Sequence, residues 1–177
     1  MVRANYSLWS ELVSYPDESR FPRLRDCVEA LAQDDPAAGE ELEPLGRFCS
    51  SHPQGEVEEV FVRTFENNAE RALELGWHLH GENYARGVFM ARLRGLLREH
   101  GIEETVELPD HLSHVLRLLD RAEPDLAGAL ARGAVLPALA RIREGFQDSD
   151  NPYLGVLTAL ERHLRALHPA KEAASDE

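Results

Sequence analysis

The chain has 177 residues, of which 43% are hydrophobic and 29% are charged. That composition is typical of a globular protein, and the length suits one domain with a sizeable core. The formal net charge of −13 argues against a nucleic-acid-binding surface, because such surfaces draw their affinity from basic residues. The charge instead favours a cationic partner such as a basic peptide, although solubility alone would also explain it.

Neither membrane insertion nor export of this chain is expected from its sequence. No run approaches the roughly 18 apolar residues that a membrane span needs, and the first residues lack the apolar stretch of a signal peptide. Cys27 and Cys49 are the two cysteines, and their separation matches no metal or redox motif. We therefore expect reduced thiols in a cytoplasmic protein.

The first third of the chain shows the apolar spacing of helices. Helices are predicted over Asn5–Tyr15 and Phe21–Ala32. The segment Asp34–Ser51 is also helical in pattern, but Gly39 and Pro44 predict a bend or two short helices. A loop is expected over residues 50–55, where serine, proline and glycine cluster.

A sharper helix is predicted over Glu56–Glu66, with glutamates in its first turn and one narrow apolar stripe. The stripe consists of Val57, Val60, Phe61, Thr64 and Phe65. The following segment Ala69–Gly81 mixes histidines, a tryptophan and glycines, and we interpret it as a partly irregular connection.

A long helix is predicted over Glu82–His100, closed by Gly101 as a C-terminal cap. After a short acidic connection, Pro109 suits the first turn of the next helix, and Asp110 suits its positive end. The connection over residues 102–108 would also permit exchange of helices between two copies, so a monomer and a homodimer both remain open.

Further helices follow. One begins near Pro124 and is expected to be interrupted at Gly133 and Pro137, and the last begins at Pro152 after a loop. No strand-like alternation of useful length appears. The sequence therefore predicts an all-α, single-domain bundle of about eight helices over residues 1–169. Residues 170–177 are expected to form a polar, disordered tail.

Four histidines raise the possibility of a metal site. His78 and His80 lie two positions apart, and His111 and His114 lie three apart near Asp110. Imidazole and carboxylate groups bind zinc and similar metals, but these spacings match no established ligand motif. A helical metal-binding protein or enzyme using these four histidines is the alternative hypothesis. The sequence contains no hydrolase, phosphate-loop or dinucleotide motif, so we expect no catalytic activity.

Arg86 and Gly87 form a second candidate feature. A glycine inside a helix costs about 1 kcal/mol relative to alanine, so Gly87 is expected to admit a neighbouring backbone. Arg86 is expected to pair with Glu82, four residues earlier, either as an exposed ion pair or as part of a binding site. Similarly, Glu107, Asp110 and His111 either cap a helix or line a mobile hinge beside a groove.

The order of several motifs resembles that of the TorD/DmsD/NarJ family, the assembly chaperones of molybdenum oxidoreductases. The most specific of them is ELPDH at Glu107–His111. The others are LVSYPDE at Leu12–Glu18, FVRTFE at Phe61–Glu66, RGVFMARL at Arg86–Leu93 and NPYLGVLTALE at Asn151–Glu161. The first and last of these point to the NarJ-like branch, the nitrate reductase delta subunits.

The resemblance implies an all-helical, TorD-like fold and a noncatalytic role in the cytoplasm. Its partner would be the N-terminal segment of the apo catalytic subunit of a nitrate reductase-like molybdoenzyme, held while the molybdenum cofactor is inserted, before membrane attachment or export. No cofactor would be held permanently by the chaperone itself. The residues expected to bind the partner or to act as a hinge are Phe65, Glu82, Arg86, Gly87, Glu107, Pro109, Asp110 and His111. A helical interaction module unrelated to molybdoenzymes is a third hypothesis.

Overall fold

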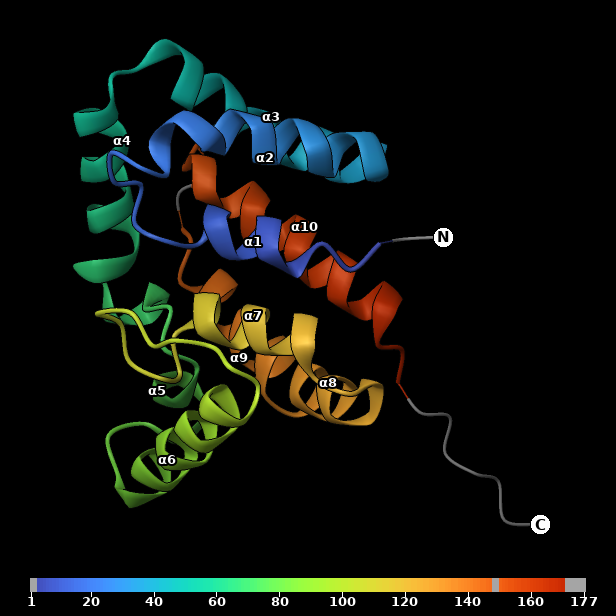
Figure 1. Cartoon of the computed structure of the whole chain (residues 1–177). Coiled ribbons are helices and arrows are strands. Elements are labelled where there is room, and N and C mark those ends of the chain that lie inside the picture. Colours follow the sequence, from blue (N-terminus) through green and yellow to red (C-terminus); the bar gives the residue numbers. More distant parts are fainter. Residues whose placement is uncertain (1–2, 148–149, 171–177) are drawn as a thin grey trace.

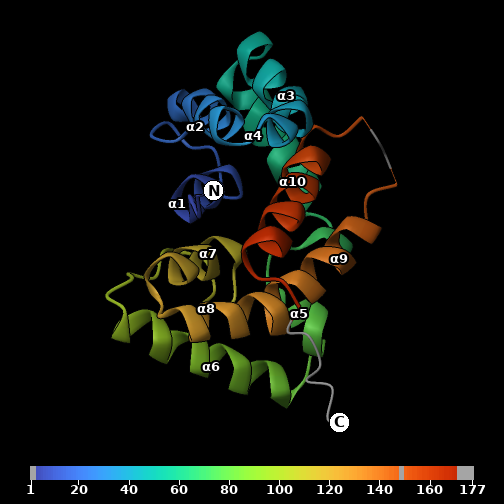
Figure 2. The same ribbon diagram turned by 90° about the vertical axis from the view of Figure 1, so that its right-hand side faces the viewer.

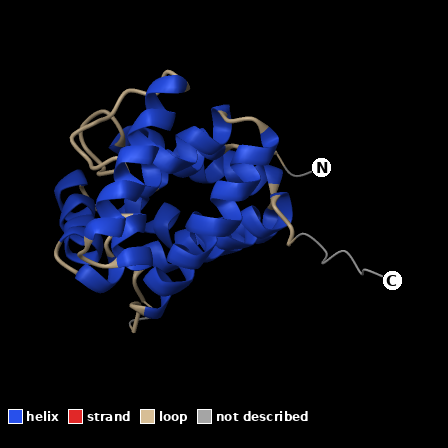
Figure 3. Ribbon diagram, turned by 90° about the horizontal axis from the view of Figure 1, so that it is seen from below, coloured by secondary structure: helices blue, strands red, loops and turns tan. Residues whose placement is uncertain are grey.

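Helices form the regular structure of the computed structural model, which describes residues 3–147 and 150–170 (Figures 1 and 3). Within those ranges there is no β-strand, only one isolated bridge between two loop residues. The predicted all-α class is therefore confirmed. None of the helices in the described ranges is long and apolar enough to cross a membrane.

The N-terminal half begins with three helices and a longer helical run. Their bounds are α1 Tyr6–Leu12, α2 Phe21–Asp34, α3 Pro36–Ser51 and α4 Gln54–Phe61, which continues into the π-helical turn η1 Val62–Glu66. A 3₁₀ turn η2 Ala69–Arg71 leads to α5 Leu75–His80 and α6 Tyr84–Glu99. After a loop follow α7 Leu112–Arg121, α8 Pro124–Leu130, the π turn η3 Ala131–Val135, α9 Leu136–Glu144 and α10 Pro152–Leu167.

The antiparallel-looking pair α2 and α3 forms one end of the molecule, and α5 with α6 forms the other (Figures 1 and 2). The last helix, α10, lies between them and packs on α3 and α9, while α1 packs on α7. Large side chains from most of these helices meet in one buried cluster, among them Trp9, Leu42, Leu116, Leu139 and Tyr153. The helices that are far apart in the sequence thus share a core around α10.

Helix α3 runs from Pro36 to Ser51 with Pro44 inside it, so the predicted alternative of two short helices is wrong. Gly39 allows α2 to come close, because a Cβ there would lie 2.8 Å from the Cβ of Ala32. Pro44 is exposed, and the face that includes Leu42 and Leu45 is fully buried. Burial of that face outweighs the roughly 3 kcal/mol that an interior proline costs. The expected loop after α3 shrinks to His52 and Pro53.

Two further predicted breaks are absent. Gly133 lies within η3 and Pro137 in the first turn of α9, so α8, η3 and α9 form one helical run without interruption. Proline has no backbone N–H to donate. The π turn before Pro137 already departs from the regular i to i−4 hydrogen-bond pattern, so the missing donor is tolerated there. The segment expected to be irregular before Gly81 also contains a helix, α5.

The remaining predicted boundaries differ in how well they agree with the structure. Helix α1 ends at Leu12, three residues before the predicted end at Tyr15, whereas α10 begins at Pro152 as expected. Gly101, with φ 63°, closes α6. Cys27 and Cys49 are buried and free, and burial raises the pKa of the Cys49 thiol to about 11. Residues 148–149 of the predicted loop and residues 171–177 of the predicted tail lie outside the described ranges.

Candidate partner-binding site

The loop between α6 and α7 ends in the Pro109-Asp110-His111 segment, which lies before the helix and not in its first turn. Helix α7 begins at Leu112, and His111 is its N-cap. The Nδ1 atom of His111 accepts a hydrogen bond from the backbone N–H of Ser113 at 3.2 Å. His111 therefore caps a helix, as one reading of the sequence predicted. Pro109 and Asp110, in contrast, lie outside α7, in the loop before it.

This part of the loop lies beside the segment that leads into α5. The backbone N–H of Leu75 donates to the carbonyl of Asp110 at 2.9 Å, and the N–H of Leu112 donates to the carbonyl of Leu73 at 2.8 Å. These two bonds form the isolated antiparallel bridge between Glu74 and His111. The loop before α7 is thereby fixed to the start of α5.

Asp110 completes this connection with its side chain, which is fully buried. Its Oδ2 atom accepts a hydrogen bond from the backbone N–H of Gly76 at 3.0 Å. The first amides of an α-helix have no partner within the helix, and a carboxylate there also complements the helix dipole. Asp110 thus caps α5, and not the helix that follows it in the sequence.

Arg86 pairs with this same carboxylate. Its Nε atom lies 3.5 Å from Oδ2 of Asp110, and its side chain is only 18% exposed. The predicted pair with Glu82 is therefore wrong, since Glu82 is exposed and forms no ion pair within the described residues. The reason is that a partner brought close by the chain fold competes with the one four residues away on the same helix.

Close packing against a glycine occurs at Gly76 and not at Gly87. A Cβ added at Gly76 would lie 2.6 Å from Oδ2 of Asp110 and 3.0 Å from Cδ1 of Phe89, both of them side-chain atoms. At Gly87, by contrast, an added Cβ would meet no atom within 4 Å. The prediction for Gly87 is therefore wrong, and at this site it is Gly76 that has no room for a side chain.

His114 holds the rest of the loop. Its Nδ1 atom donates to the carbonyl of Leu108 at 2.9 Å, so its Nε2 atom is left to accept from the backbone N–H of Thr105 at 3.0 Å. Burial lowers the pKa of His114, which keeps the ring neutral and suited to both roles. The side chain of one α7 residue thus spans the loop from Thr105 to Leu108.

The four histidines of the metal hypothesis do not gather into one site. His78 bonds through Nε2 to the carbonyl of Ala72 at 2.7 Å, and the rings of His111 and His114 have their centres 6.3 Å apart. Among the described residues, no group of three or more His, Cys, Asp or Glu side chains is placed to hold a metal ion. The described residues thus offer no contact that favours the metal-binding alternative.

A cavity of about 160 Å³ opens beside the bridge, and we call it the acidic cavity. It brings together three of the predicted residues, Phe65, Glu107 and His111. The other residues that line it are Phe61, Glu66, Ala72, Leu73 and Glu74. The remaining predicted residues do not line this cavity. Pro109 and Asp110 are buried within the loop, and Arg86 pairs with Asp110. Glu82 and Gly87 are exposed.

The three glutamates give this cavity its charge. Burial raises the pKa of Glu74, and the neighbouring charge of Asp110 raises it further. Burial also raises the pKa of Glu107, with added repulsion from Glu74 and Glu66. These carboxylates therefore lack enough positive charge nearby, and a cation entering the cavity would relieve that repulsion.

Two aromatic side chains also line the acidic cavity. The rings of Phe61 and Phe65 lie edge to face with centres 5.1 Å apart, and each also contacts Tyr153. Both phenylalanines are at most 3% exposed, so they form a fixed surface. An apolar side chain next to a cationic one would match these rings and the carboxylates together.

Glu66, Glu74 and Gly76 were not recognised from the sequence. Glu74 and Gly76 fall in the segment that was expected to be irregular, and their role depends on a partner segment more than thirty residues away. Glu66 ends both a predicted helix and the FVRTFE motif, but nothing local indicated that it would face Glu74 and Glu107. The two motifs that meet at this cavity are FVRTFE and ELPDH.

Comparison with known proteins agrees with this architecture. The family described as nitrate reductase delta subunit matches residues 31–159, which is most of the chain. A crystal structure described as a redox enzyme maturation protein from Archaeoglobus fulgidus superimposes with a TM-score of 0.67. It shares 16% sequence identity over 93% of this chain and 94% of the other, so this likeness bears on the fold alone. A comparison with curated protein sequences gives no match. The resemblance seen in the sequence motifs is thus confirmed, and the chain belongs to the nitrate reductase delta-subunit family.

Proposed function

We propose that this protein is a noncatalytic, cytoplasmic assembly chaperone for a nitrate reductase-like molybdoenzyme. In this proposal it binds the N-terminal segment of the apo catalytic subunit and assists insertion of the molybdenum cofactor. The client carries the cofactor, and the chaperone holds none permanently. Membership of the nitrate reductase delta-subunit family supports this role.

The acidic cavity is the observation that carries the proposal. It brings three glutamates together with two buried phenylalanines at the end of the loop that contains the ELPDH motif. A client segment that presents arginine or lysine beside an apolar residue would pair with both kinds of side chain. Cavities of this size hold one or two side chains, so the rest of such a segment would lie across the surface outside it.

The buried contacts behind the cavity explain how the loop holds its shape. Asp110 fixes the loop to α5, and Arg86 supplies the opposite charge. His111 lines the cavity and also caps α7. A movement of the loop would therefore change the contacts at the start of α7 as well as those at the start of α5. In this proposal Glu107 contacts the client, whereas Asp110 and Arg86 are positioning residues.

Calorimetric titration with the N-terminal peptide of a molybdoenzyme catalytic subunit tests the proposal directly. We expect saturable binding that weakens with added salt, because the contacts pair opposite charges. A second peptide, with each arginine and lysine replaced by glutamine, should bind at least about tenfold more weakly. Failure of every such client peptide to bind would overturn the proposal.

A matched pair of variants locates the binding site. Glu107→Gln removes one charge from the cavity and should weaken binding of the peptide. Glu29→Gln removes one charge from an exposed position on α2, where the side chain is 63% exposed, and should leave binding unchanged. Equal loss in both variants would mean that overall charge, and not the acidic cavity, attracts the peptide.

The role in cofactor insertion needs its own measurement. The catalytic subunit would be produced with and without the chaperone, and its molybdenum content determined by elemental analysis. We expect a lower content without the chaperone and restoration by the native protein. Equal molybdenum content under both conditions would contradict a role in insertion, while leaving the peptide-binding result intact.

A further inference from the structure

A second and larger cavity lies on the other side of the helical run formed by α4 and η1. Its volume is about 600 Å³, within the range of small-molecule sites. Val60, Arg63 and Thr64 face it, whereas Phe61, Phe65 and Glu66 line the acidic cavity. Because three arginines line it, we call it the arginine cavity. The two sides of one helical run therefore present cavities of opposite charge.

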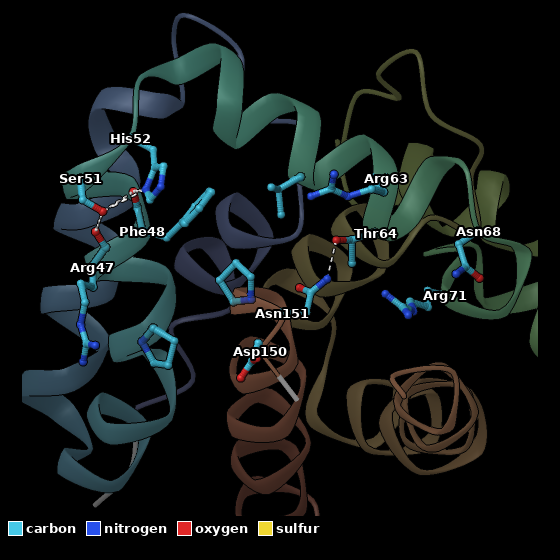
Figure 4. A pocket seen from close by; sticks show the side chains of 13 residues that line it. Arg47, Phe48, Ser51, His52, Arg63, Thr64, Asn68, Arg71, Asp150 and Asn151 are labelled. Carbon is cyan, nitrogen blue, oxygen red and sulfur yellow. Dashed lines mark hydrogen bonds between the residues drawn. The ribbon is translucent and has the colours of Figure 1, made fainter. Parts of the chain in front are cut away.

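Arginines stand out here because the chain as a whole carries a net charge of −13. Figure 4 shows Arg63 and Arg71 on one side of the arginine cavity, with Arg47 on the other. Arg71 is held in place, since its Nε atom donates to the carbonyl of Gly145 at 2.9 Å and its guanidinium lies over the ring of Phe146. The remaining N–H groups of that guanidinium are available to an oxygen-rich ligand.

Arg63 is restrained only weakly, whereas Arg47 is held more closely. Arg63 pairs with Glu59, one helical turn away at 3.7 Å, and both side chains are at least 70% exposed. Arg47 forms a bidentate pair with Glu43 through Nε and Nη2, also one turn apart on an exposed surface. An exposed and loosely formed pair such as that of Arg63 contributes little to stability, so a multiply charged anion can replace it at little cost.

The side of the cavity opposite Arg63 and Arg71 is flat and partly apolar. The rings of Phe48 and His52 stack with centres 4.0 Å apart and an angle of 25° (Figure 4). Pro44, Val60 and Pro152 add apolar surface. A planar ring bound to an anionic group would contact this surface while its charge met the guanidiniums.

Polar groups lie between these two sides. Asn151 caps α10 and donates from Nδ2 to Oγ1 of Thr64 at 2.8 Å (Figure 4). The N-terminus of the 16-residue helix α10 carries a positive partial charge, which adds to the attraction of the arginines for an anion. Asp150 also lines the cavity, so the described part of the lining holds one carboxylate and three guanidiniums.

The size of the charged region favours a compact anion over an acidic peptide. A peptide would extend its carboxylates onto the surrounding surface, where the net negative charge of the chain repels them within about 8 Å, the screening length at physiological salt. A phosphate concentrates its charge within the reach of two guanidiniums. Arginine also matches phosphate geometry with paired hydrogen bonds.

We propose that the arginine cavity binds a small phosphate ester, with its phosphate on Arg63 and Arg71 and its ring on Phe48 and His52. This proposal is independent of client binding, because the acidic cavity shares none of these four residues. The ligand class is a phosphate monoester of a planar heterocycle. Neither part of such a ligand would bind as well alone.

Calorimetric titration of the full chain with adenosine 5′-monophosphate, inorganic phosphate, adenosine and a short glutamate peptide tests the proposal. We expect the nucleotide to bind more tightly than the other three probes, and we expect its affinity to fall as salt is added. Adenosine binding as tightly as its phosphate would overturn it. So would preference for the glutamate peptide, or no saturable binding of the nucleotide at about 10 mM.

Two variants and a control complete the test. Arg63→Gln should weaken nucleotide binding about tenfold or more, and because the side chain is 70% exposed the protein should still fold. Arg71→Gln should do the same, with melting temperature measured because Arg71 also contacts Gly145 and Phe146. Arg25→Gln is the control, since Arg25 pairs with Glu29 on α2 at the same 3.7 Å. Equal loss in Arg25→Gln and Arg63→Gln would overturn the proposal.

Discussion

The carboxylate of Asp110 accepts a hydrogen bond from the backbone N–H of Gly76, 34 positions earlier in the chain, at 3.0 Å. The cap of α5 is therefore supplied by the loop that leads into α7. Arg86 approaches the same oxygen, Oδ2, with its Nε atom at 3.5 Å. This arrangement makes the ELPDH motif part of the support for the acidic cavity, and it can be tested by substitution.

Replacement of Asp110 should lower the stability of the whole chain. Asp110→Ala leaves the N–H of Gly76 and the partly buried Arg86 without a partner, which should cost about 3 kcal/mol of unfolding free energy. Asp110→Asn keeps an acceptor for Gly76 and should cost less. Urea denaturation measures both, with Arg25→Ala as an exposed control expected within about 0.5 kcal/mol of the native chain. An Asp110→Ala chain as stable as the native one would contradict the capping role.

Two glycines should respond to the same substitution in opposite directions. Gly76→Ala forces a methyl group to within 2.6 Å of Asp110 and should cost about 1–3 kcal/mol. Gly87→Ala places the methyl group in open space on an exposed helix and should add about 0.5–1 kcal/mol. Thermal unfolding distinguishes them. A loss of stability at Gly87 would show that the helix needs its glycine for another reason.

His111 should make the protein less stable in acid. Burial lowers the pKa of His111 to about 3 from its ordinary 6.5, with smaller effects from the charges of His114 and Arg117. Between those values the unfolded chain binds the additional proton, so the free energy of unfolding falls by about 1.4 kcal/mol for each unit below pH 6.5. The burial of His78, His114 and His163 acts in the same direction.

His111→Asn isolates this contribution, because asparagine can also cap a helix but does not titrate. Urea unfolding at several values from pH 7 to pH 5 should give a shallower dependence than in the native chain. The expected difference is about 1.4 kcal/mol per pH unit. Identical slopes for the two proteins would mean that His111 is protonated in the folded state.

Glu74 should favour binding at the expense of stability. Its pKa is raised, chiefly by burial, so its ionised form destabilises the fold above the ordinary carboxyl pKa of 4.5. Glu74→Gln should therefore raise the melting temperature at pH 7, with the gain disappearing below pH 4.5, where the native side chain is protonated in both states. The same variant should bind the basic client peptide more weakly. A higher melting temperature with unchanged peptide affinity would place the client elsewhere.

The sequence predicted the helices well where the pattern is local. Pro152 and Gly101 mark real helix ends, and the apolar stripe containing Phe61 and Phe65 faces the core. Local rules also caused the errors, since Pro44 and Pro137 were given too much weight. The stability of those helices comes from the burial of side chains against α2 and α10, which no short window of sequence reveals.

The site could be predicted only as a neighbourhood. Glu107 and His111 of the ELPDH motif line one cavity together with Phe65, and their role there stays a prediction. The partner of Arg86 was assigned wrongly because periodicity reports neighbours one turn away and nothing about Asp110 in the next loop. Contacts across the fold require the relative positions of α5, α6 and α7, and these are fixed by tertiary packing.

Residues of the π-helical turn η1 line both cavities, so the number of residues in this turn affects both. A π turn holds one residue more than an α turn, and each residue in a helix rotates the next side chain by about 100°. Deleting Val62 would move Arg63, Thr64 and Phe65 each by one position and so turn their side chains together by about 100° relative to α4. The separation of acidic from basic surface therefore depends on the number of residues in this turn as much as on their identity.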